Sequence, residues 1–421
     1  FRNQLITLLK VMTGIHVKEG NLFVENILGA ELAKKYGTPA FIYSSEVIRN
    51  NYALYSNEKR EDDLICYAVK ANSNLNILKM LVDIGSGFDV VSGNELKKCL
   101  LAGADKNKIV FSGVAKSEEE ITHAIENEIL SINIESINEY KRIEKISSSL
   151  NKKVKCALRV NPDITIGSHK YIETGAKSSK FGLGKKDVNE VSELALKSEN
   201  IELTTIACHI GSQISDENLI LQSLDYIFVI AEELKKQGHE ISCLDIGGGL
   251  GIKYHNEKKG DPALLIKEIK RRLNGTNYKF ILEPGRSIIG NAGILISKVE
   301  YIKEAGDKKF AIVDTGMNDL IRPSLYEAWH GVMELENRKV KSEKYDIAGP
   351  VCETGDVLAT DRELRILPND IIALMDVGAY GSVMSSNYNS RLKPVEILVT
   401  GDKAEVIRRR ESFEDLIALE T

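Results

Sequence analysis

The sequence has few features of disulfide-bonded, metal-bound or membrane-spanning proteins. Six cysteines occur in 421 residues, and no two of them form a CxxC pair. Such scattered cysteines indicate neither a disulfide framework nor a zinc site, and they fit a reducing cytoplasm. No apolar run approaches the roughly 18 residues needed to cross a bilayer. The opening FRNQLITLLKVM is too short and too interrupted for a secretory core, and a start at Phe1 instead of Met leaves a removed leader open.

An excess of charge of one sign is also missing. The chain has 56 basic and 61 acidic side chains, which gives a formal net charge of -5. This balance gives no electrostatic footprint for nucleic acid or for an anionic membrane. With 43% hydrophobic residues the chain can bury a large core, and its length favours two domains. Small-molecule chemistry is therefore the expected class of function.

Short β-rich apolar runs alternate with amphipathic stretches between residues 64 and 286. This alternation is typical of a parallel sheet with crossover helices. In the intervening stretches apolar residues recur at helical spacing, for example Leu96, Leu100 and Leu101. The eight apolar runs are LICYAVK (64–70), GFDVVS (87–92), KIVFSG (108–113), LSINIES (130–136), KCALRVN (155–161), TTIACHIG (204–211), CLDIGGG (243–249) and KFILEPG (279–285).

Eight strand-helix units within about 225 residues are close to what a (β/α)8 barrel of the TIM type requires. A doubly wound open sheet is the alternative. After Gly293 the pattern changes to short β-rich runs such as KFAIVDTG and KYDIAGP, with few helical stretches. We therefore predict an α/β barrel domain over residues 45–290. Residues 1–44 and 291–421 are expected to form a second, mostly β domain, to which the strand-like AFIYS near the N-terminus belongs.

Chemically active residues stand where the predicted strands end. In (β/α)8 enzymes the active site lies at the carboxyl ends of the strands. A lysine that closes an apolar run is partly desolvated, and desolvation favours the neutral amine that attacks a carbonyl group. The residues at the strand ends are Lys70, Arg159, Asn161, His209, Gly247, Gly248, Gly249, Glu283, Gly285 and Arg286.

Glycine turns follow the seventh and eighth strands, where barrel enzymes commonly bind a phosphate on backbone N–H groups. They are GGGLG (247–251) and EPGR (283–286). GGGLG alone also fits a plain glycine turn, because no helix pattern starts directly after it. With these turns, a reactive lysine (Lys70), a carboxylate for a pyridinium nitrogen (Glu283) and a stacking ring (His209) describe a pyridoxal 5'-phosphate (PLP) site. Taken singly, each of the three side chains has an ordinary structural explanation.

Seven motifs spread over nearly the whole chain resemble one enzyme family. The sequence resembles the diaminopimelate decarboxylases, which are PLP enzymes of fold type III with an alanine racemase-like barrel. The motifs, in chain order, are YAVKAN (67–72), HIGSQ (209–213), GGGLG (247–251), EPGR (283–286), RPSLY (322–326), CETGD (352–356) and GAYG (378–381).

The resemblance implies the reaction and the residues that perform it. The reaction would be the decarboxylation of meso-2,6-diaminopimelate to L-lysine and CO2, the last step of lysine biosynthesis. Lys70 would form the Schiff base with PLP, His209 would stack on the ring, and Glu283 would pair with the pyridine nitrogen. The phosphate would be bound by Ser212, Gly248, Glu283, Pro284, Gly285 and Arg286. Substrate would be bound by Arg286, Arg322, Tyr326, Glu353 and Tyr380, the last of which also touches the cofactor.

By the same resemblance, Cys352 would be the proton donor. Cys352 and Glu353 would come from the partner subunit, so that a homodimer shares its active sites. The segment from Thr165 to Lys180 resembles the family's active-site loop, and an ordinary exposed loop is its alternative.

The choice of substrate depends on the CETGD motif. The related ornithine decarboxylases have an aspartate after the equivalent cysteine, so Glu353 favours diaminopimelate, while Thr354 replaces the serine that is common in this motif. A sister decarboxylase acting on ornithine, arginine, lysine or carboxynorspermidine is the alternative. An amino-acid racemase would typically set an arginine against the pyridine nitrogen. A catalytically inactive homologue would be expected to lose Lys70 or Cys352, and both are present.

Overall fold

The computed structural model describes residues 14–164 and 180–420, and it divides into two compact units. One unit comprises residues 51–288. The other combines the N-terminal segment up to residue 50 with residues from 289 onward. Each unit is described by itself.

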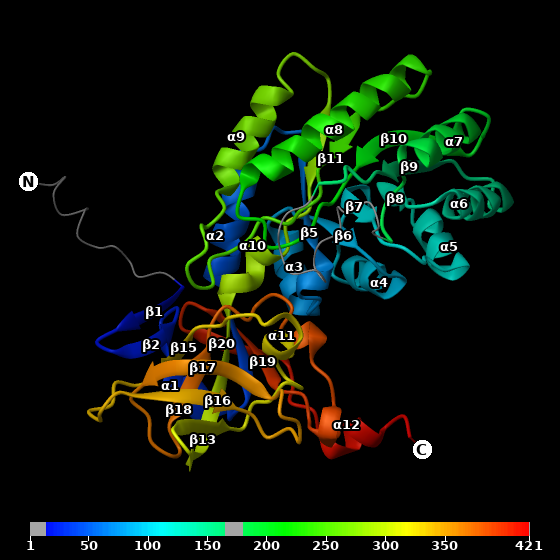
Figure 1. Cartoon of the computed structure of the whole chain (residues 1–421). Coiled ribbons are helices and arrows are strands. Elements are labelled where there is room, and N and C mark those ends of the chain that lie inside the picture. The colour runs from blue at the N-terminus through cyan, green and yellow to red at the C-terminus, as the bar shows by residue number, and fades with distance from the viewer. Residues whose placement is uncertain (1–13, 165–179, 421) are drawn as a thin grey trace, which may run out of the picture. The chain divides into compact units, whose positions relative to one another are not determined.

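Eight parallel strands of the first unit close into a barrel within the described residues (Figure 1). Each apolar run that the sequence predicted to be a strand overlaps one barrel strand, although β9 and β10 begin before their predicted runs, so the barrel is confirmed and the open sheet is excluded. The ring closes where β12 pairs with β5, with Ile281 opposite Leu64. The strands are β5 (Leu64–Ala68), β6 (Gly87–Val90), β7 (Ile109–Phe111), β8 (Ser131–Ile134), β9 (Val154–Arg159), β10 (Ile201–Ala207), β11 (Cys243–Asp245) and β12 (Lys279–Leu282).

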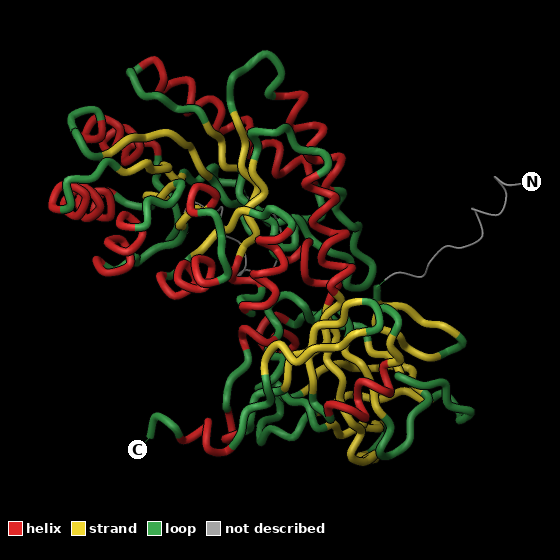
Figure 2. Tube along the Cα trace, turned by 180° about the vertical axis from the view of Figure 1, so that it is seen from behind, coloured by secondary structure: helices red, strands yellow, loops and turns green. Residues whose placement is uncertain are grey.

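Helices surround the barrel strands (Figure 2). Six of them begin at a polar cap, because the side chains of Asn74, Ser92, Ser117, Ser136, Asp216 and Asp261 each accept a hydrogen bond from a backbone N–H of the first turn. The helices between residues 45 and 289 are α2 (Ser45–Ser56), α3 (Leu75–Asp83), α4 (Gly93–Leu101), α5 (Glu118–Glu126), α6 (Ile137–Ser149), α7 (Lys185–Ala195), α8 (Glu217–Lys236), α9 (Pro262–Arg272) and α10 (Arg286–Ile289).

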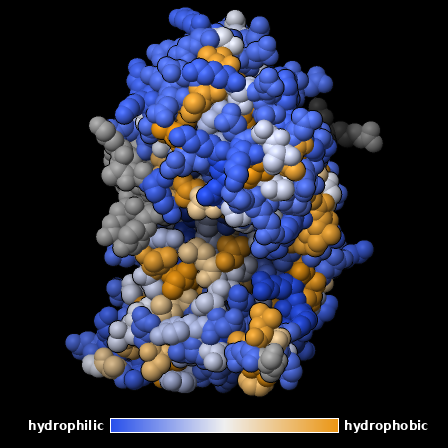
Figure 3. Space-filling model, turned by 90° about the vertical axis from the view of Figure 1, so that its right-hand side faces the viewer, coloured by the Kyte–Doolittle hydropathy of each residue, from blue (hydrophilic) through white to orange (hydrophobic). Residues whose placement is uncertain are grey.

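The apolar spacing predicted for α4 is only partly correct. Leu96 is buried, but Leu101 is 71% exposed at the end of the helix. The buried face consists of Gly93, Leu96 and Cys99, which repeat every three residues. Figure 3 shows other apolar side chains scattered among hydrophilic ones on one face of the molecule, and single exposed apolar residues are common on protein surfaces.

The second unit is mostly β, as predicted. Its larger sheet has nine strands in the described part of the chain, in the order β17-β16-β14-β13-β4-β19-β20, with β18 pairing with β13 and β15. Strand β4 (Ala40–Ser44), which contains the predicted AFIYS, pairs with β13 (Gly293–Ala305) and β19 (Val395–Thr400). The N-terminal segment therefore completes a sheet built mainly from the C-terminal part. The other strands of this sheet are β14 (Lys308–Val313), β15 (Val332–Glu334), β16 (Glu343–Ala348), β17 (Val357–Leu364), β18 (Ile371–Leu374) and β20 (Lys403–Arg408).

A separate small sheet and short helices complete this unit. The small sheet consists of β1 (Ile15–Lys18), β2 (Asn21–Val24) and β3 (Ile27–Leu28). The helices are α1 (Gly29–Tyr36), α11 (Arg322–Tyr326) and α12 (Phe413–Ile417). Among the described residues, no helix is both long and apolar enough to span a membrane.

Candidate active site

Lys70 lies directly after β5, in the short 3-10 turn η1 (Val69–Ala71). Its Nζ donates a hydrogen bond to Oδ2 of Asp89 over 2.6 Å. The Lys70 side chain is 33% exposed, whereas that of Asp89 is completely buried in β6. The sequence argument had identified the lysine but missed its partner. The available signal was an acidic residue inside the buried run GFDVVS.

Glu283 follows β12 and lies beside Asp245 of β11. Burial, followed by the charges of Asp245 and Asp89, raises the pKa of Glu283 well above its usual value. Burial also raises the pKa of Asp245 to about 7. Two buried carboxyl groups in contact do not readily ionise together, so the pair retains a proton at neutral pH. A cation bound at Glu283 would remove the need for that proton.

His209 follows β10 and presents a neutral ring. Its Nδ1 accepts a hydrogen bond from the Gly248 N–H at 3.2 Å, which assigns the proton to Nε2. Burial lowers the pKa of His209 well below its usual value, and the positive charges of Lys70 and Arg159 lower it further. A neutral, partly buried imidazole is suited to packing against an aromatic ring.

The GGGLG turn is required by close packing. A Cβ on Gly247, which has a φ of +71°, would lie 2.4 Å from the Cys208 carbonyl oxygen. A Cβ on Gly248 would lie 2.1 Å from the Glu283 carbonyl oxygen. The N–H groups of both glycines already donate to side chains, Gly247 to Asp245 and Gly248 to His209. The turn therefore holds the ends of three strands together, besides any contact it makes with a ligand.

Arg286 and Ser212 come together at the same end of the barrel. Arg286 Nη2 donates to Ser212 Oγ at 3.0 Å, and Nη1 donates to Tyr254 Oη at 2.7 Å. A guanidinium and a hydroxyl group in contact form a donor set suited to an anion such as a phosphate. Tyr254 had no role in the sequence argument, and it orients the guanidinium.

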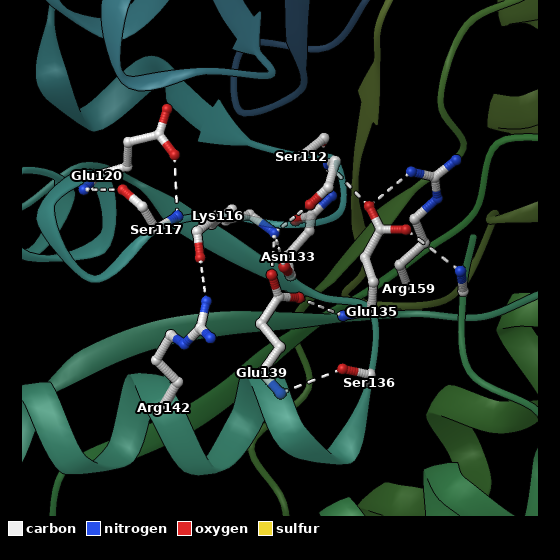
Figure 4. A network of polar contacts seen from close by, with 12 residues as sticks. Ser112, Lys116, Ser117, Glu120, Asn133, Glu135, Ser136, Glu139, Arg142 and Arg159 are labelled. Carbon is white, nitrogen blue, oxygen red and sulfur yellow. Dashed lines mark hydrogen bonds and ion pairs between the residues drawn. The ribbon is translucent and has the colours of Figure 1, made fainter. Parts of the chain in front are cut away.

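A buried ionic network lies behind Arg159 (Figure 4). Glu135 Oε1 accepts hydrogen bonds from Arg159 Nη1 at 2.8 Å and from the Gly113 N–H at 2.7 Å. The Glu135 N–H donates to Glu139, and Glu139 also accepts from the buried Lys116 at 3.0 Å. Because these contacts link the ends of β7, β8 and β9, they fix the Arg159 guanidinium at the mouth of the barrel. The sequence argument identified only Arg159.

Two further motifs meet within the second unit. Arg322 and Tyr326 are the ends of α11, and Arg322 Nη1 lies 2.9 Å from Nε2 of the buried His330. Ser324 in the same helix donates its hydroxyl to the Gly355 carbonyl of the CETGD motif at 2.7 Å. The RPSLY and CETGD segments of one chain are therefore neighbours.

Cys352 and Glu353 occupy the loop between β16 and β17. Cys352 is the one exposed cysteine in the described part of the chain. Its backbone N–H donates to Asn389 Oδ1 at 2.9 Å. Glu353 lies against Tyr388, and its charge raises the pKa of that phenol. An accessible thiol beside a carboxylate can serve as a proton donor to a bound substrate.

Tyr380 has a φ of +58°, which is rare for an aromatic residue. Such a conformation persists only where the surrounding structure enforces it, and it is frequent at functional positions.

Residues 165–179 of the predicted active-site loop (Thr165 to Lys180) lie outside the part of the chain that the structure describes. The predicted site residues from Lys70 to Arg286 lie in the first unit. Those from Arg322 to Tyr380 lie in the second unit.

Comparisons with known proteins agree with these features. Residues 46–290 match the family described as pyridoxal-dependent decarboxylase, pyridoxal binding domain. The diaminopimelate decarboxylase of Haemophilus influenzae is 45% identical over 97% of this chain and 100% of its own length. That of Aquifex aeolicus is 44% identical over 96% of both chains. The chain belongs to the diaminopimelate decarboxylase family.

Solved structures of diaminopimelate decarboxylases have the same fold. The Helicobacter pylori enzyme complexed with L-lysine has a TM-score of 0.90 and 42% identity, over 93% of this chain and 98% of that one. The enzyme of M. jannaschii in complex with L-lysine has a TM-score of 0.91 and 37% identity, over 97% and 98%. The predicted family and fold class are thus confirmed.

The barrel of this diaminopimelate decarboxylase family member fits PLP, the cofactor of the family. Lys70 would supply an amine for the cofactor aldehyde, and Arg286 with Ser212 would supply donors for the phosphate. The buried carboxyl of Glu283 suits a protonated pyridine nitrogen. Asp89 Oδ1 is buried and has no hydrogen-bond partner among the described residues. A polar group introduced beside Lys70 would satisfy it.

Proposed function

We propose that this chain decarboxylates meso-2,6-diaminopimelate to L-lysine and CO2 with PLP, the last step of lysine biosynthesis. The observation that carries the proposal is the identity of 40–45% to curated diaminopimelate decarboxylases over at least 95% of the chain. The ion pair of Lys70 with Asp89 and the buried Glu283 support it, because they suit the cofactor on which this reaction depends.

The barrel residues hold the cofactor and control its charge. When bound, PLP supplies the electron sink that removal of CO2 from an α-amino acid requires. Lys70 would hold the cofactor through its amine. Glu283 would hold the protonated pyridine nitrogen, and His209 would pack on the ring. Ser212, Gly248 and the segment from Glu283 to Arg286 bind the phosphate.

Arg286 of the barrel and residues of the second unit recognise the substrate. Diaminopimelate carries two carboxylates and two amines, and arginine side chains bind carboxylates in a bidentate manner. Arg286, Arg322 and Tyr326 bind the substrate carboxylates, while Glu353 accepts hydrogen bonds from the distal ammonium. Cys352 donates a proton to the α-carbon after CO2 has left, and Tyr380 contacts both cofactor and substrate.

The assembly belongs to the same proposal. The protein is a homodimer in which Cys352 and Glu353 complete the site of the partner subunit.

The proposed location is the cytoplasm, where the six free cysteines stay reduced. Residues 45–290 form the barrel domain, and residues 1–44 with 291–421 form the β domain.

The deciding experiment measures CO2 release from meso-diaminopimelate by PLP-loaded protein, with ornithine, arginine and lysine tested in parallel. We expect release from meso-diaminopimelate alone. Release from one of the other amino acids only would refute the substrate and assign the chain to a sister decarboxylase. Failure to bind PLP covalently would refute the assigned cofactor site.

A further inference from the structure

The loop that carries Cys352 and Glu353 runs from Gly349 to Asp356 and contains neither helix nor strand. It connects β16, which ends at Ala348, to β17, which begins at Val357. A proton donor must be placed within a fraction of an ångström, so something other than regular secondary structure has to fix this loop.

Asp356 fulfils this task through contacts on both sides of the loop. Its Oδ2 accepts a hydrogen bond from the Val351 N–H at 2.7 Å, and its Oδ1 accepts one from the Met317 N–H at 2.6 Å. Its carbonyl oxygen accepts from the Gly349 N–H at 3.0 Å. The residue is only 3% exposed. One buried carboxylate thus joins the start of the loop, its end and a separate turn.

The close packing around this carboxylate requires small neighbours. A Cβ on Gly349 would lie 2.3 Å from Asp356 Oδ2, and a Cβ on Gly316 would lie 3.1 Å from the same atom. The segment at Gly349 therefore approaches the carboxylate to a distance that only glycine permits, and the segment at Gly316 leaves little room for a larger residue. The arrangement suits the short carboxylate of an aspartate, which accepts hydrogen bonds from backbone N–H groups.

The turn on the far side of Asp356 leads into the RPSLY helix. Gly316 donates its N–H to Asp319 Oδ2 at 3.0 Å, and the chain then enters α11 at Arg322. The hydroxyl of Ser324 closes the link by donating to the Gly355 carbonyl at 2.7 Å. Asp356 and Ser324 thereby hold the CETGD loop and the RPSLY helix as one body.

We propose that Asp356 is a positioning residue that fixes the conformation of the CETGD loop, and with it the places of Cys352 and Glu353 on the second unit. It does so without touching the substrate. This inference rests on the function proposed above, because Cys352 matters as a proton donor only there. The sequence comparison assigned roles to the first two residues of CETGD and none to its aspartate.

The test uses the PLP-loaded full-length protein with Asp356→Asn. Asparagine has one acceptor oxygen, and its amide group would face a backbone N–H donor, so one of the two side-chain contacts, with Val351 or with Met317, is lost. The matched control is Asp370→Asn. Asp370 lies in the same unit, accepts the Leu367 N–H at 2.8 Å and pairs with Arg338 at 2.7 Å, but it makes no recorded hydrogen bond or ion pair with the CETGD loop.

Two readouts separate positioning from general destabilisation. The first is the rate of Cys352 alkylation by iodoacetamide, followed by mass spectrometry of its peptide. Cys352 is exposed, whereas Cys66, Cys99, Cys156 and Cys208 are buried and serve as internal references. The second is the division between kcat and KM for CO2 release. We expect Asp356→Asn to change the alkylation rate several-fold and to lower kcat by about tenfold or more, with a smaller change in KM.

Equal alkylation rates and equal kcat in Asp356→Asn and Asp370→Asn would overturn the proposal. Should Asp356→Asn fail to fold, Ser324→Ala takes its place, because it removes only the hydroxyl link to Gly355. An unchanged Cys352 rate and kcat in that variant would also refute the idea. The alkylation rate requires no substrate, so it decides about Asp356 even where the protein decarboxylates a different amino acid.

Discussion

Replacing Glu283 with glutamine should weaken the pH dependence of stability in the cofactor-free protein. The reason is the buried pair of Glu283 and Asp245. Burial raises the pKa of Asp245 from 3.8 to about 7 and that of Glu283 well above its usual value. Between pH 3.8 and about pH 7 the folded state therefore binds more protons than the unfolded state. The stability contributed by the pair is fully present below pH 3.8 and is lost as the pH rises through 7.

The size of the effect follows from the shift. One pKa unit corresponds to about 1.4 kcal/mol, so a shift from 3.8 to about 7 at Asp245 gives on the order of 4 kcal/mol as an upper bound. In Glu283→Gln the titration of Glu283 itself is removed, whereas burial still raises the pKa of Asp245. One of the two groups that release a proton late is then gone, so we expect about half of the wild-type loss of stability between pH 5 and pH 8.

The assay is urea unfolding of the cofactor-free protein between pH 5 and 8, with infrared detection of protonated carboxylic acids in the folded state. Asp319→Asn is the control. Burial raises the pKa of Asp319 to about 7 as well, but this residue lies in the other unit. Adding PLP should remove the infrared signal of the pair in the wild type and leave that of Asp319. Identical pH slopes in wild type and Glu283→Gln would refute the reasoning.

Three further outcomes follow from the proposed roles. Borohydride reduction of the PLP-loaded protein should fix the cofactor on the peptide that contains Lys70, and Lys70→Ala should show no such adduct and about three orders of magnitude less activity. Mixing Lys70→Ala with Cys352→Ala should restore about a quarter of the wild-type activity, because half of the dimers then contain one complete site; no restoration would contradict shared sites. Glu353→Asp should lower kcat/KM for meso-diaminopimelate about 10-fold to 100-fold, since one methylene group is removed from the contact with the distal ammonium. An unchanged kcat/KM would refute the assignment of Glu353 as a residue that binds the substrate.

The sequence predicted the barrel because each strand is visible in the sequence as a short apolar run of its own. A parallel barrel places the carboxyl ends of all strands at one edge, so Lys70 and Glu283 could be brought together although they are far apart in the chain. The same rule brought His209 and Arg286 to that edge. The mostly β character of the second unit was visible in the short runs after Gly293.

The partners of these residues were not predictable from the sequence. Asp89 and Asp245 interrupt apolar runs, and such an interruption does not reveal which neighbouring side chain will face it across the barrel. Asp356 accepts hydrogen bonds from backbone N–H groups of Val351 and Met317. Backbone donors leave no trace in a sequence, so the role of this residue depends on tertiary structure alone.

The charges at the mouth of the barrel also explain why the site favours a cationic ring. Lys70 is paired with Asp89, and Arg159 is paired with Glu135. Among the described residues, this leaves Asp245 and Glu283 without a full positive charge of their own, and a buried unpaired carboxylate is costly. In the free protein a proton held by the pair removes this cost. A protonated pyridine nitrogen at Glu283 would replace that proton with a fixed charge, so the feature that makes the free protein sensitive to pH would also favour the cofactor.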